Sequence, residues 1–226
     1  MTGAGREKLD VQELIRETLA AIAALKARSV PALRGVRRGL SAKLKQAEAA
    51  DVKAVALGLA KAGRKWMGYE VINQHKTALK SVTIEEVEAL GEGMASWGEV
   101  DGFGVLLSGA AWLNGAIADA DVKRWAKSED VWWRRAALVS TVVLNGKTRG
   151  GKGDAKRTLM ICKMLVRDRE DMIVKAMSWA LRSLAPWDAK AVKAFLAEHE
   201  DALAARVKRE VRNKLRTGLK TPKKAH

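Results

Sequence analysis

The sequence predicts an all-α protein. Apolar residues recur at helical spacing along most of the 226 residues, and the helix-favouring residues Ala, Leu, Lys, Arg and Glu dominate. Prolines occur only at positions 31, 186 and 222, and no segment alternates as a half-buried strand does. Short helices joined by short loops form pairs of about 30 to 45 residues, the size of HEAT-like and related solenoid repeats. The pattern alone therefore predicts a helical domain, and a solenoid fits it.

The expected helices follow one another with short connections. In the first half of the chain, periodicity predicts helices over Val11–Arg28, Pro31–Gln46, Asp51–Ala62, Arg64–Leu79, Thr83–Met94 and Val100–Ala116. In the second half it predicts helices over Asp121–Lys127, Glu129–Leu144, Asp154–Val166, Glu170–Leu184, Pro186–His199 and Asp201–Thr217. We expect a single domain over residues 1–217. The remainder, 218–226, is rich in lysine and is expected to be a disordered basic tail.

Residues that can satisfy free helix-end amides mark several of these starts. Ser29 precedes Pro31, whose missing N–H suits a first helical turn. Thr83 and Glu86 have the spacing of a capping box. The side chains of three aspartates are plausible N-caps, at Asp51, Asp121 and Asp154.

The charge balance favours a polyanionic partner. Lys and Arg number 42 and Asp and Glu 26, which gives a net charge of +16. DNA, RNA or an anionic membrane surface would complement such a chain. No apolar run approaches the roughly 20 residues of a membrane span, and the start of the sequence lacks the apolar core of a secretory signal. The one cysteine, Cys162, suits a reducing compartment, so the cytosol and its nucleoid are the expected location.

Two other kinds of site, a phosphate-binding loop and a metal site, are not supported by the sequence. The segment Gly146–Gly153 nearly matches a phosphate-binding loop, but Gly153 stands where Ser or Thr should bind magnesium. We therefore expect a mobile basic loop over Asn145–Gly153, in which four of the nine residues are glycine. The histidines are isolated and no Cys-x-x-Cys occurs, so we expect no metal and no cofactor. Cys162 lies among apolar residues and is expected to be inert.

Tryptophan is unusually frequent. Eight Trp stand against two Phe and one Tyr. We expect core packing for Trp66, Trp112 and Trp187, and leave the roles of Trp125 and Trp133 open. Function and packing are equally good readings of Trp97, Trp132 and Trp179. Helical spacing places Trp132 with Arg135, and Lys175 with Trp179 and Arg182, and such basic and indole faces suit nucleic acid.

Three blocks of sequence together resemble the DNA alkylation repair family of AlkD-like glycosylases. They are Ser96-Trp97-Gly98-Glu99-Val100-Asp101, Ser128-Glu129-Asp130-Val131-Trp132-Trp133-Arg134-Arg135-Ala136-Ala137-Leu138, and Lys175-Ala176-Met177-Ser178-Trp179-Ala180-Leu181-Arg182. The blocks keep the family's order and rough spacing, and the resemblance is good over residues 90 to 216. It is weaker before that range.

The resemblance implies a fold, a reaction and a set of site residues. The fold is a HEAT-like α-solenoid of antiparallel helix pairs whose concave basic face holds duplex DNA. The reaction is the excision of cationic alkylated purines, such as 3-methyladenine and 7-methylguanine, by hydrolysis of the N-glycosidic bond. The family's catalytic residues match Asp101, Trp97, Arg135 and Trp179. We expect DNA contacts from Arg135, Trp132, Lys147, Arg149, Lys152, Lys175 and Arg182, with the protein acting as a monomer.

The chain departs from the family's pattern and leaves alternatives. Ser96 stands where the family often has a second Trp, and the Asn145–Gly153 loop is longer, which puts the lesion range in doubt. Asp101 could be only a helix N-cap, and Arg135 only part of an inter-helix ion pair. The protein would then be a non-catalytic HEAT-like DNA-binding protein. A helical scaffold for an acidic partner would explain the charge but not the set of Asp, Trp and Arg.

Overall fold

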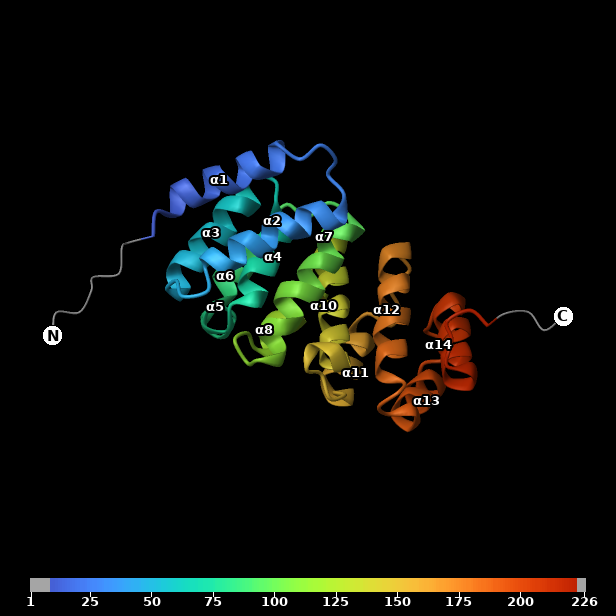
Figure 1. The fold of residues 1–226 in the computed structure, drawn as a ribbon. Coiled ribbons are helices and arrows are strands. Elements are labelled where there is room, and N and C mark those ends of the chain that lie inside the picture. Colours follow the sequence, from blue (N-terminus) through green and yellow to red (C-terminus); the bar gives the residue numbers. More distant parts are fainter. Residues whose placement is uncertain (1–8, 223–226) are drawn as a thin grey trace. The chain divides into compact units, whose positions relative to one another are not determined.

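The computed structural model describes residues 9–222, which form helices, turns and loops but no strand (Figure 1). The all-α prediction is therefore confirmed. None of the helices in this range is long and apolar enough to cross a membrane. The chain divides into two compact units, the first ending at Leu90 and the second beginning at Gly91. Within each unit neighbouring helices pack on one another, as in an α-solenoid. The single domain over 1–217 and the concave basic face stay predictions.

The first unit packs its helices around one apolar core. It contains α1 (Val11–Ala23), α2 (Val30–Lys43), α3 (Ala49–Lys61), α4 (Lys65–Gln74), α5 (Lys76–Ser81) and nearly all of α6 (Ile84–Gly91). Buried side chains from α1 to α5 form the core, among them Leu14, Ile22, Leu40, Val55, Leu59 and Met67. This unit accounts for the first helices of the sequence prediction.

Two of the expected helices in this unit differ most from the structure. The helix predicted over Val11–Arg28 stops at Ala23. The helix predicted over Arg64–Leu79 is wrong as one element, because the chain leaves helical geometry at His75. The His75 Nδ1 atom accepts a hydrogen bond from the Ala78 amide at 3.1 Å and so caps the start of α5.

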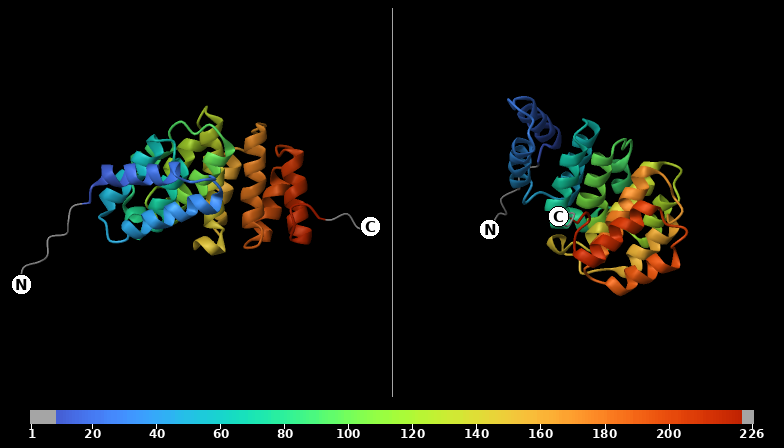
Figure 2. Two further views of the ribbon diagram at one scale, coloured as in Figure 1. Left: turned by 45° about the horizontal axis from the view of Figure 1, so that its top comes forward. Right: turned by 90° about the vertical axis from the view of Figure 1, so that its right-hand side faces the viewer.

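The second unit is built around α10. Its elements are α7 (Trp97–Gly102), the π-helical segment η1 (Phe103–Ser108), α8 (Gly109–Leu113), α9 (Asp119–Ala126), α10 (Val131–Leu144), the 3₁₀ turn η2 (Lys147–Arg149), α11 (Ala155–Met164), α12 (Asp171–Leu184), α13 (Ala189–Glu198) and α14 (Ala205–Thr217). Helices α10, α12 and α14 lie side by side in that order (Figures 1 and 2). The predicted helix over Val100–Ala116 starts earlier, at Trp97, and is interrupted by η1.

The expected helix caps are only partly correct. Ser29, Asp154 and the Thr83–Glu86 capping box are confirmed by hydrogen bonds to helix-end amides. Asp51 is not an N-cap, because α3 starts at Ala49 and places Asp51 in its first turn. Asp121 also lies within a first turn, where its carboxylate accepts the Ala118 amide at 2.8 Å. Both aspartates lie in the first helical turn, where the backbone amides lack intrahelical acceptors, and not at the N-cap position.

The tryptophans divide between core and surface. Trp112 is fully buried, which confirms its expected packing role, and Trp66 packs against the core of the first unit. Trp125 and Trp133 each contact Phe103 edge-to-face and also contact each other, with ring centroids 5.3 to 5.8 Å apart, so both belong to the core of the second unit. The expected core role of Trp187 is wrong, since 37% of this residue is exposed. Its indole N–H instead donates to the Asn145 carbonyl.

The glycine-rich segment 145–153 has a defined structure, contrary to the expectation of a mobile loop. Gly150 and Gly153 adopt φ angles of 84° and 82°, which glycine tolerates without steric cost. The Gly153 amide donates to the Leu144 carbonyl at 3.1 Å. The Lys147 ammonium lies 5.1 Å from the centroid of the Trp187 ring. The glycines therefore form a tight turn that packs on Trp187.

The start of the predicted tail contacts α14. Gly218 ends this helix with a φ of 74°, and the Lys220 ammonium lies 3.6 Å from a carboxylate oxygen of Glu210. Residues 223–226, which include two of the tail's lysines, lie outside the described residues. Disorder of the tail stays a prediction for them.

Candidate functional site

A carboxylate and a guanidinium form the centre of the candidate site. Asp101 lies near the end of α7 and Arg135 in the second turn of α10. The Nε and Nη2 atoms of Arg135 donate to the two carboxylate oxygens of Asp101, each at 3.0 Å. Such a bidentate pair fixes both the distance and the plane of the carboxylate. Asp101 is therefore not an N-cap, because α7 starts four residues earlier and continues directly into η1.

The two partners differ in their access to solvent. The Arg135 side chain is 6% exposed, whereas the Asp101 side chain is 21% exposed. Arg135 is held from the other side by the Met172 carbonyl of α12, to which its Nη1 atom donates. Arginine has five N–H donors, so these contacts leave donors available to a further acceptor. The arrangement leaves the Asp101 carboxylate partly exposed on a fixed support.

An exposed indole lies one helical turn before the carboxylate. Trp97 is the first residue of α7, and Ser96 caps this helix by accepting the Glu99 amide at 3.3 Å. Residues four apart share a helix face, so Trp97 and Asp101 lie on the same side of α7. Trp97 is 62% exposed. Core packing therefore does not explain Trp97, in contrast to Trp133.

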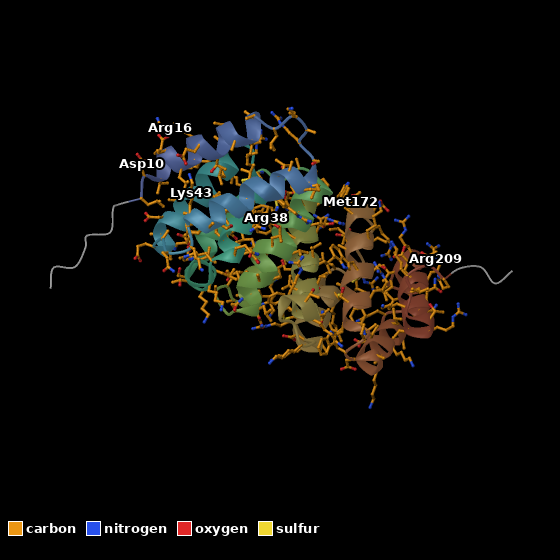
Figure 3. All side chains as sticks on the ribbon, viewed as in Figure 1. Asp10, Arg16, Arg38, Lys43, Met172 and Arg209 are labelled. Atoms are coloured by element: carbon orange, nitrogen blue, oxygen red, sulfur yellow. The ribbon has the colours of Figure 1, made fainter. Side chains whose placement is uncertain are left out.

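A basic pocket adjoins Arg135. Its volume is ≈ 490 Å³, and it is lined by Arg135, Lys175, Trp179, Arg182, Arg206, Arg209, Glu210 and Lys220. These side chains come from three neighbouring elements, α10, α12 and α14, and the chain end after α14; Figure 3 marks Arg209 on α14. Six cations surround one carboxylate and one indole. Such a pocket attracts phosphate groups, and the indole offers a flat surface to a base or sugar.

A buried carboxylate organises part of this pocket. Glu210 is 8% exposed, and its carboxylate accepts a hydrogen bond from the hydroxyl of the fully buried Ser178 at 2.6 Å. Arg182 donates to the same hydroxyl at 3.1 Å and lies 3.9 Å from the carboxylate. Burial lowers the pKa of Arg182, and the charge of Glu210 raises it in part. Glu210 therefore fixes the guanidinium next to Trp179.

Burial and the neighbouring charge shift the pKa of Asp101 in opposite directions. Its partly buried position raises the pKa of the carboxyl above its ordinary value, and the Arg135 guanidinium offsets part of that rise. The bidentate contacts require the ionised form, since a carboxylate accepts from both N–H groups. The site thus holds a carboxylate that takes up a proton more readily than an exposed one.

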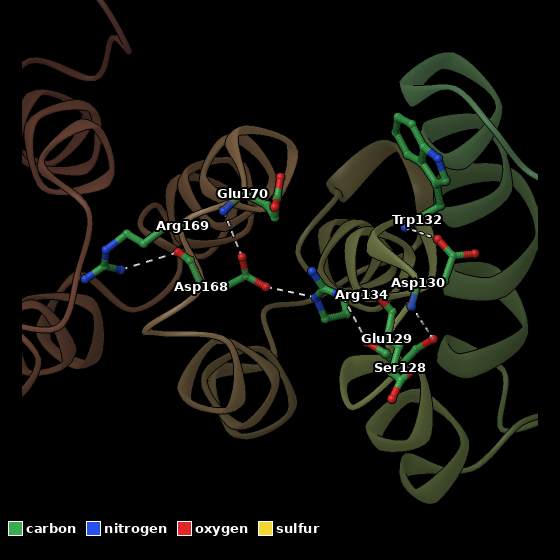
Figure 4. Close-up of polar contacts among 8 residues, drawn as sticks. All are labelled: Ser128, Glu129, Asp130, Trp132, Arg134, Asp168, Arg169 and Glu170. Atoms are coloured by element: carbon green, nitrogen blue, oxygen red, sulfur yellow. Dashed lines mark hydrogen bonds and ion pairs between the residues drawn. The ribbon is translucent and has the colours of Figure 1, made fainter.

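The N-terminal turn of α10 carries one further candidate, Trp132. This residue is partly exposed, and its amide donates to the Asp130 carboxylate at 2.8 Å (Figure 4). The next arginine, Arg134, points elsewhere, to Asp168 at 2.9 Å and to the carbonyls of Ser128 and Glu129. Arg134 therefore ties α10 to the segment before α12, and of the two arginines only Arg135 reaches Asp101.

The cations expected from the 145–153 segment do not lie with Asp101. Lys147, Arg149 and Lys152 follow the C-terminal end of α10, whereas Arg135 lies near its start. Asn145 follows Arg135 by ten residues, which corresponds to about 15 Å along a helix axis. Any DNA contact of this segment would therefore be remote from the carboxylate.

The sequence prediction named most of the site but missed one wall of the pocket. The structure brings Asp101 to Arg135, and Arg135 to Trp179, Lys175 and Arg182 in one pocket. Four lining residues, Arg206, Arg209, Glu210 and Lys220, were not predicted as site residues. The signal for two of them was present, because Arg206 and Glu210 are four apart and share one face of a helix that is strongly basic.

Comparison with known proteins assigns the family. Searches of curated proteins and of solved structures give no match. A family model described as the DNA alkylation repair enzyme matches residues 27–215, which include every residue of the site except Lys220. The match covers most of the chain, and the carboxylate, the guanidinium and the indoles that suggested alkylation repair lie within it. The chain belongs to the family of DNA alkylation repair enzymes.

Proposed function

We propose that the protein is a DNA glycosylase that excises cationic alkylated purines, of the 3-methyladenine and 7-methylguanine class, from duplex DNA. The observation that carries the proposal is the Asp101–Arg135 pair, a partly exposed carboxylate on a rigid support beside a basic pocket. A neutral or fully buried side chain could not take the place of this carboxylate in stabilising a developing positive charge on bound DNA. The cytosol and nucleoid would be its place of action.

A single catalytic carboxylate is enough for this reaction. Alkylation at N3 or N7 makes the purine cationic, so it leaves as a neutral base when the electrons of the N-glycosidic bond move to it. Positive charge then develops on the deoxyribose, as in glycoside hydrolysis. Asp101 would stabilise this charge, and water would add to C1′ and release a proton, leaving an abasic site. No protonation of the leaving base is required.

The other residues would bind and orient the DNA. Trp97, one turn before Asp101, would pack on the deoxyribose and attract its developing cation through the ring face. Trp179 would do so from the side of the pocket, where the cations of α12 and α14 would hold backbone phosphates. Arg135 would keep Asp101 oriented and would offer its remaining donors to a phosphate.

One observation favours a second function, that of a non-catalytic DNA-binding protein. Both oxygens of Asp101 already accept hydrogen bonds from Arg135, as expected for a structural ion pair between α7 and α10. The basic pocket would bind DNA whether or not excision follows. We favour catalysis because a purely structural pair does not account for the exposed Trp97.

Base release separates the two functions. The protein would be incubated with duplex DNA that carries 7-methylguanine, and free base would be measured by chromatography against a reaction without protein. The glycosylase predicts release of the methylated base in proportion to enzyme, with abasic sites in equal number. Tight binding to the duplex without release above the spontaneous rate would establish the non-catalytic function instead.

A further inference from the structure

The helix that carries Asp101 changes type one residue later, after Gly102. α7 ends at Gly102, and the next six residues, Phe103–Ser108, form the π-helical turn η1 before α8 begins at Gly109. Short π-helical turns are rare and often occur at functional sites. The hydroxyl of Ser108 reaches back to the Phe103 carbonyl, five residues earlier.

Glycines line the side of this segment that faces α10. A Cβ atom on Gly104 would lie 2.6 Å from Cγ1 of Val139, and one on Gly109 would lie 2.7 Å from the Ser140 carbonyl oxygen and 2.6 Å from Cγ2 of Val143. Contacts this short do not occur between real atoms. The backbone of η1 and α8 therefore lies directly against α10, and only glycine fits at these two positions.

The wide turn is what aligns the two glycines. Five residues of an α-helix advance about 500°, so positions 104 and 109 would differ by about 140° and could not both face α10. In a π-helix five residues make slightly more than one turn, and the Gly109 amide donates to the Gly104 carbonyl. The π turn thus brings both glycines onto the face that continues from Asp101.

The facing residues of α10 form one stripe with Arg135. Arg135, Val139 and Val143 are four apart and share a helix face. Asp101 contacts the first of them, Gly104 lies against the second and Gly109 against the third. Between the last two contacts the hydroxyls of Ser108 and Ser140, both fully buried, share a hydrogen bond of 2.7 Å. The Asp101–Arg135 ion pair therefore lies at the partly exposed end of a closely packed interface between two helices.

We propose that Gly104 and Gly109 are positioning residues, which hold Asp101 at bidentate distance from Arg135 by letting the π turn lie directly on α10. Within residues 9–222, Arg135 holds the Asp101 carboxylate, so the separation of the two helix backbones determines where this carboxylate points. The activity readout of this proposal rests on the proposed glycosylase function. The geometry of the pair can also be measured without activity.

Gly104→Ala tests the proposal, with two matched variants. Gly98→Ala makes the same change in α7 at a position where a Cβ meets nothing within 4 Å. Val139→Ala removes the Cγ1 atom with which the new methyl group collides. Single-turnover release of 7-methylguanine, affinity for undamaged duplex and melting temperature would be measured for each single variant and for Gly104→Ala/Val139→Ala.

The proposal predicts a graded pattern. Gly104→Ala should slow release at least about tenfold while undamaged duplex binds within twofold of wild type, and Gly98→Ala should release base within twofold of wild type. The double variant should recover much of the lost rate, since the collision is partly relieved. Equal rates for folded Gly104→Ala and Gly98→Ala would overturn the proposal, as would a double variant no faster than Gly104→Ala.

Two further measurements keep the test decisive. If Gly104→Ala does not fold, Ser108→Ala, which removes the hydroxyl that bonds Ser140 and the Phe103 carbonyl, should still slow release severalfold, and an unchanged rate would overturn the proposal. If wild type releases no base, the proposed function fails and NMR titration of the Asp101 carboxyl replaces the rate. Its pKa should rise in Gly104→Ala, because the carboxyl stays buried but loses Arg135. An unchanged pKa would then overturn the positioning role.

Discussion

The carboxyl of Asp101 should set the pH dependence of excision. Burial raises its pKa above the ordinary value, and the ionised form is the one that stabilises a sugar cation. Excision should therefore be full at neutral pH and decline as pH falls through this raised pKa, at higher pH than for an exposed aspartate. Single-turnover rates across the acidic range, corrected for spontaneous base loss, would measure the decline. Asp101→Asn should show no such titration, and a wild-type rate that is level down to the ordinary value would contradict the assignment.

Two tryptophans should respond oppositely to the same substitution. Trp97 is 62% exposed, so Trp97→Ala should leave the melting temperature nearly unchanged and slow excision about tenfold, the equivalent of one cation–π contact. Trp133 packs against both Phe103 and Trp125, so Trp133→Ala should reduce the free energy of unfolding by about 3 to 5 kcal/mol. Thermal unfolding and excision assays on both variants check this. A destabilised Trp97→Ala with a normal rate per folded molecule would remove Trp97 from the site.

At the residue scale, the sequence could predict which side chains form the site but not which side chains contact one another. Asp101, Trp97, Arg135 and Trp179 were predicted through the resemblance, and the structure brings Asp101 to Arg135. That Arg135 rather than Arg134 reaches the carboxylate depends on which face of α10 meets α7, and adjacent residues differ by about 100° around a helix. The pairing of Glu210 with Ser178 joins residues on different helices, which no local pattern encodes.

At the element scale, the basic segment 145–153 should contribute to DNA affinity and not to chemistry. Replacing Lys147, Arg149 and Lys152 with Gln should weaken binding to damaged and undamaged duplex alike, because phosphate contacts carry no information on the lesion. Excision at saturating enzyme should be unchanged, because the segment follows the end of α10 remote from Asp101. Fluorescence anisotropy and single-turnover release measure the two effects. A slower release at saturation with normal affinity would place the segment in the reaction.

Most helices followed from periodicity, and the exceptions have physical causes. The break at His75 depends on one imidazole that accepts an amide hydrogen bond, a choice that helical spacing does not reveal. The π turn η1 inserts one extra residue into an apolar stretch without any proline to mark it. The segment 145–153 was expected to be mobile from its glycines, whereas those glycines supply the positive φ angles of a defined turn. The sequence shows that glycine can adopt many backbone conformations, but tertiary contacts determine which conformation each glycine adopts.

At the scale of the whole molecule, the net charge of +16 predicts strongly salt-dependent binding. Each phosphate that is neutralised by Lys or Arg releases condensed counterions, which high salt opposes. With about six phosphate contacts, affinity for undamaged duplex should fall on the order of a thousandfold between about 50 and 200 mM salt. Titrations at several salt concentrations give the slope directly. A slope near zero would mean that the excess charge does not meet a polyanion.

The proposed function depends on Asp101 stabilising the sugar cation during excision. The most direct test compares single-turnover release of 7-methylguanine by wild type and Asp101→Asn, at enzyme concentrations that saturate the duplex. Asn keeps the shape of the side chain but not its charge, so the rate should fall at least about 100-fold, or roughly 3 kcal/mol in the transition state. Undamaged duplex should bind as well or more tightly, since a negative charge near phosphates is removed. Equal rates in a folded variant would show that Asp101 is only the partner of Arg135 in an ion pair between two helices, and would contradict the account.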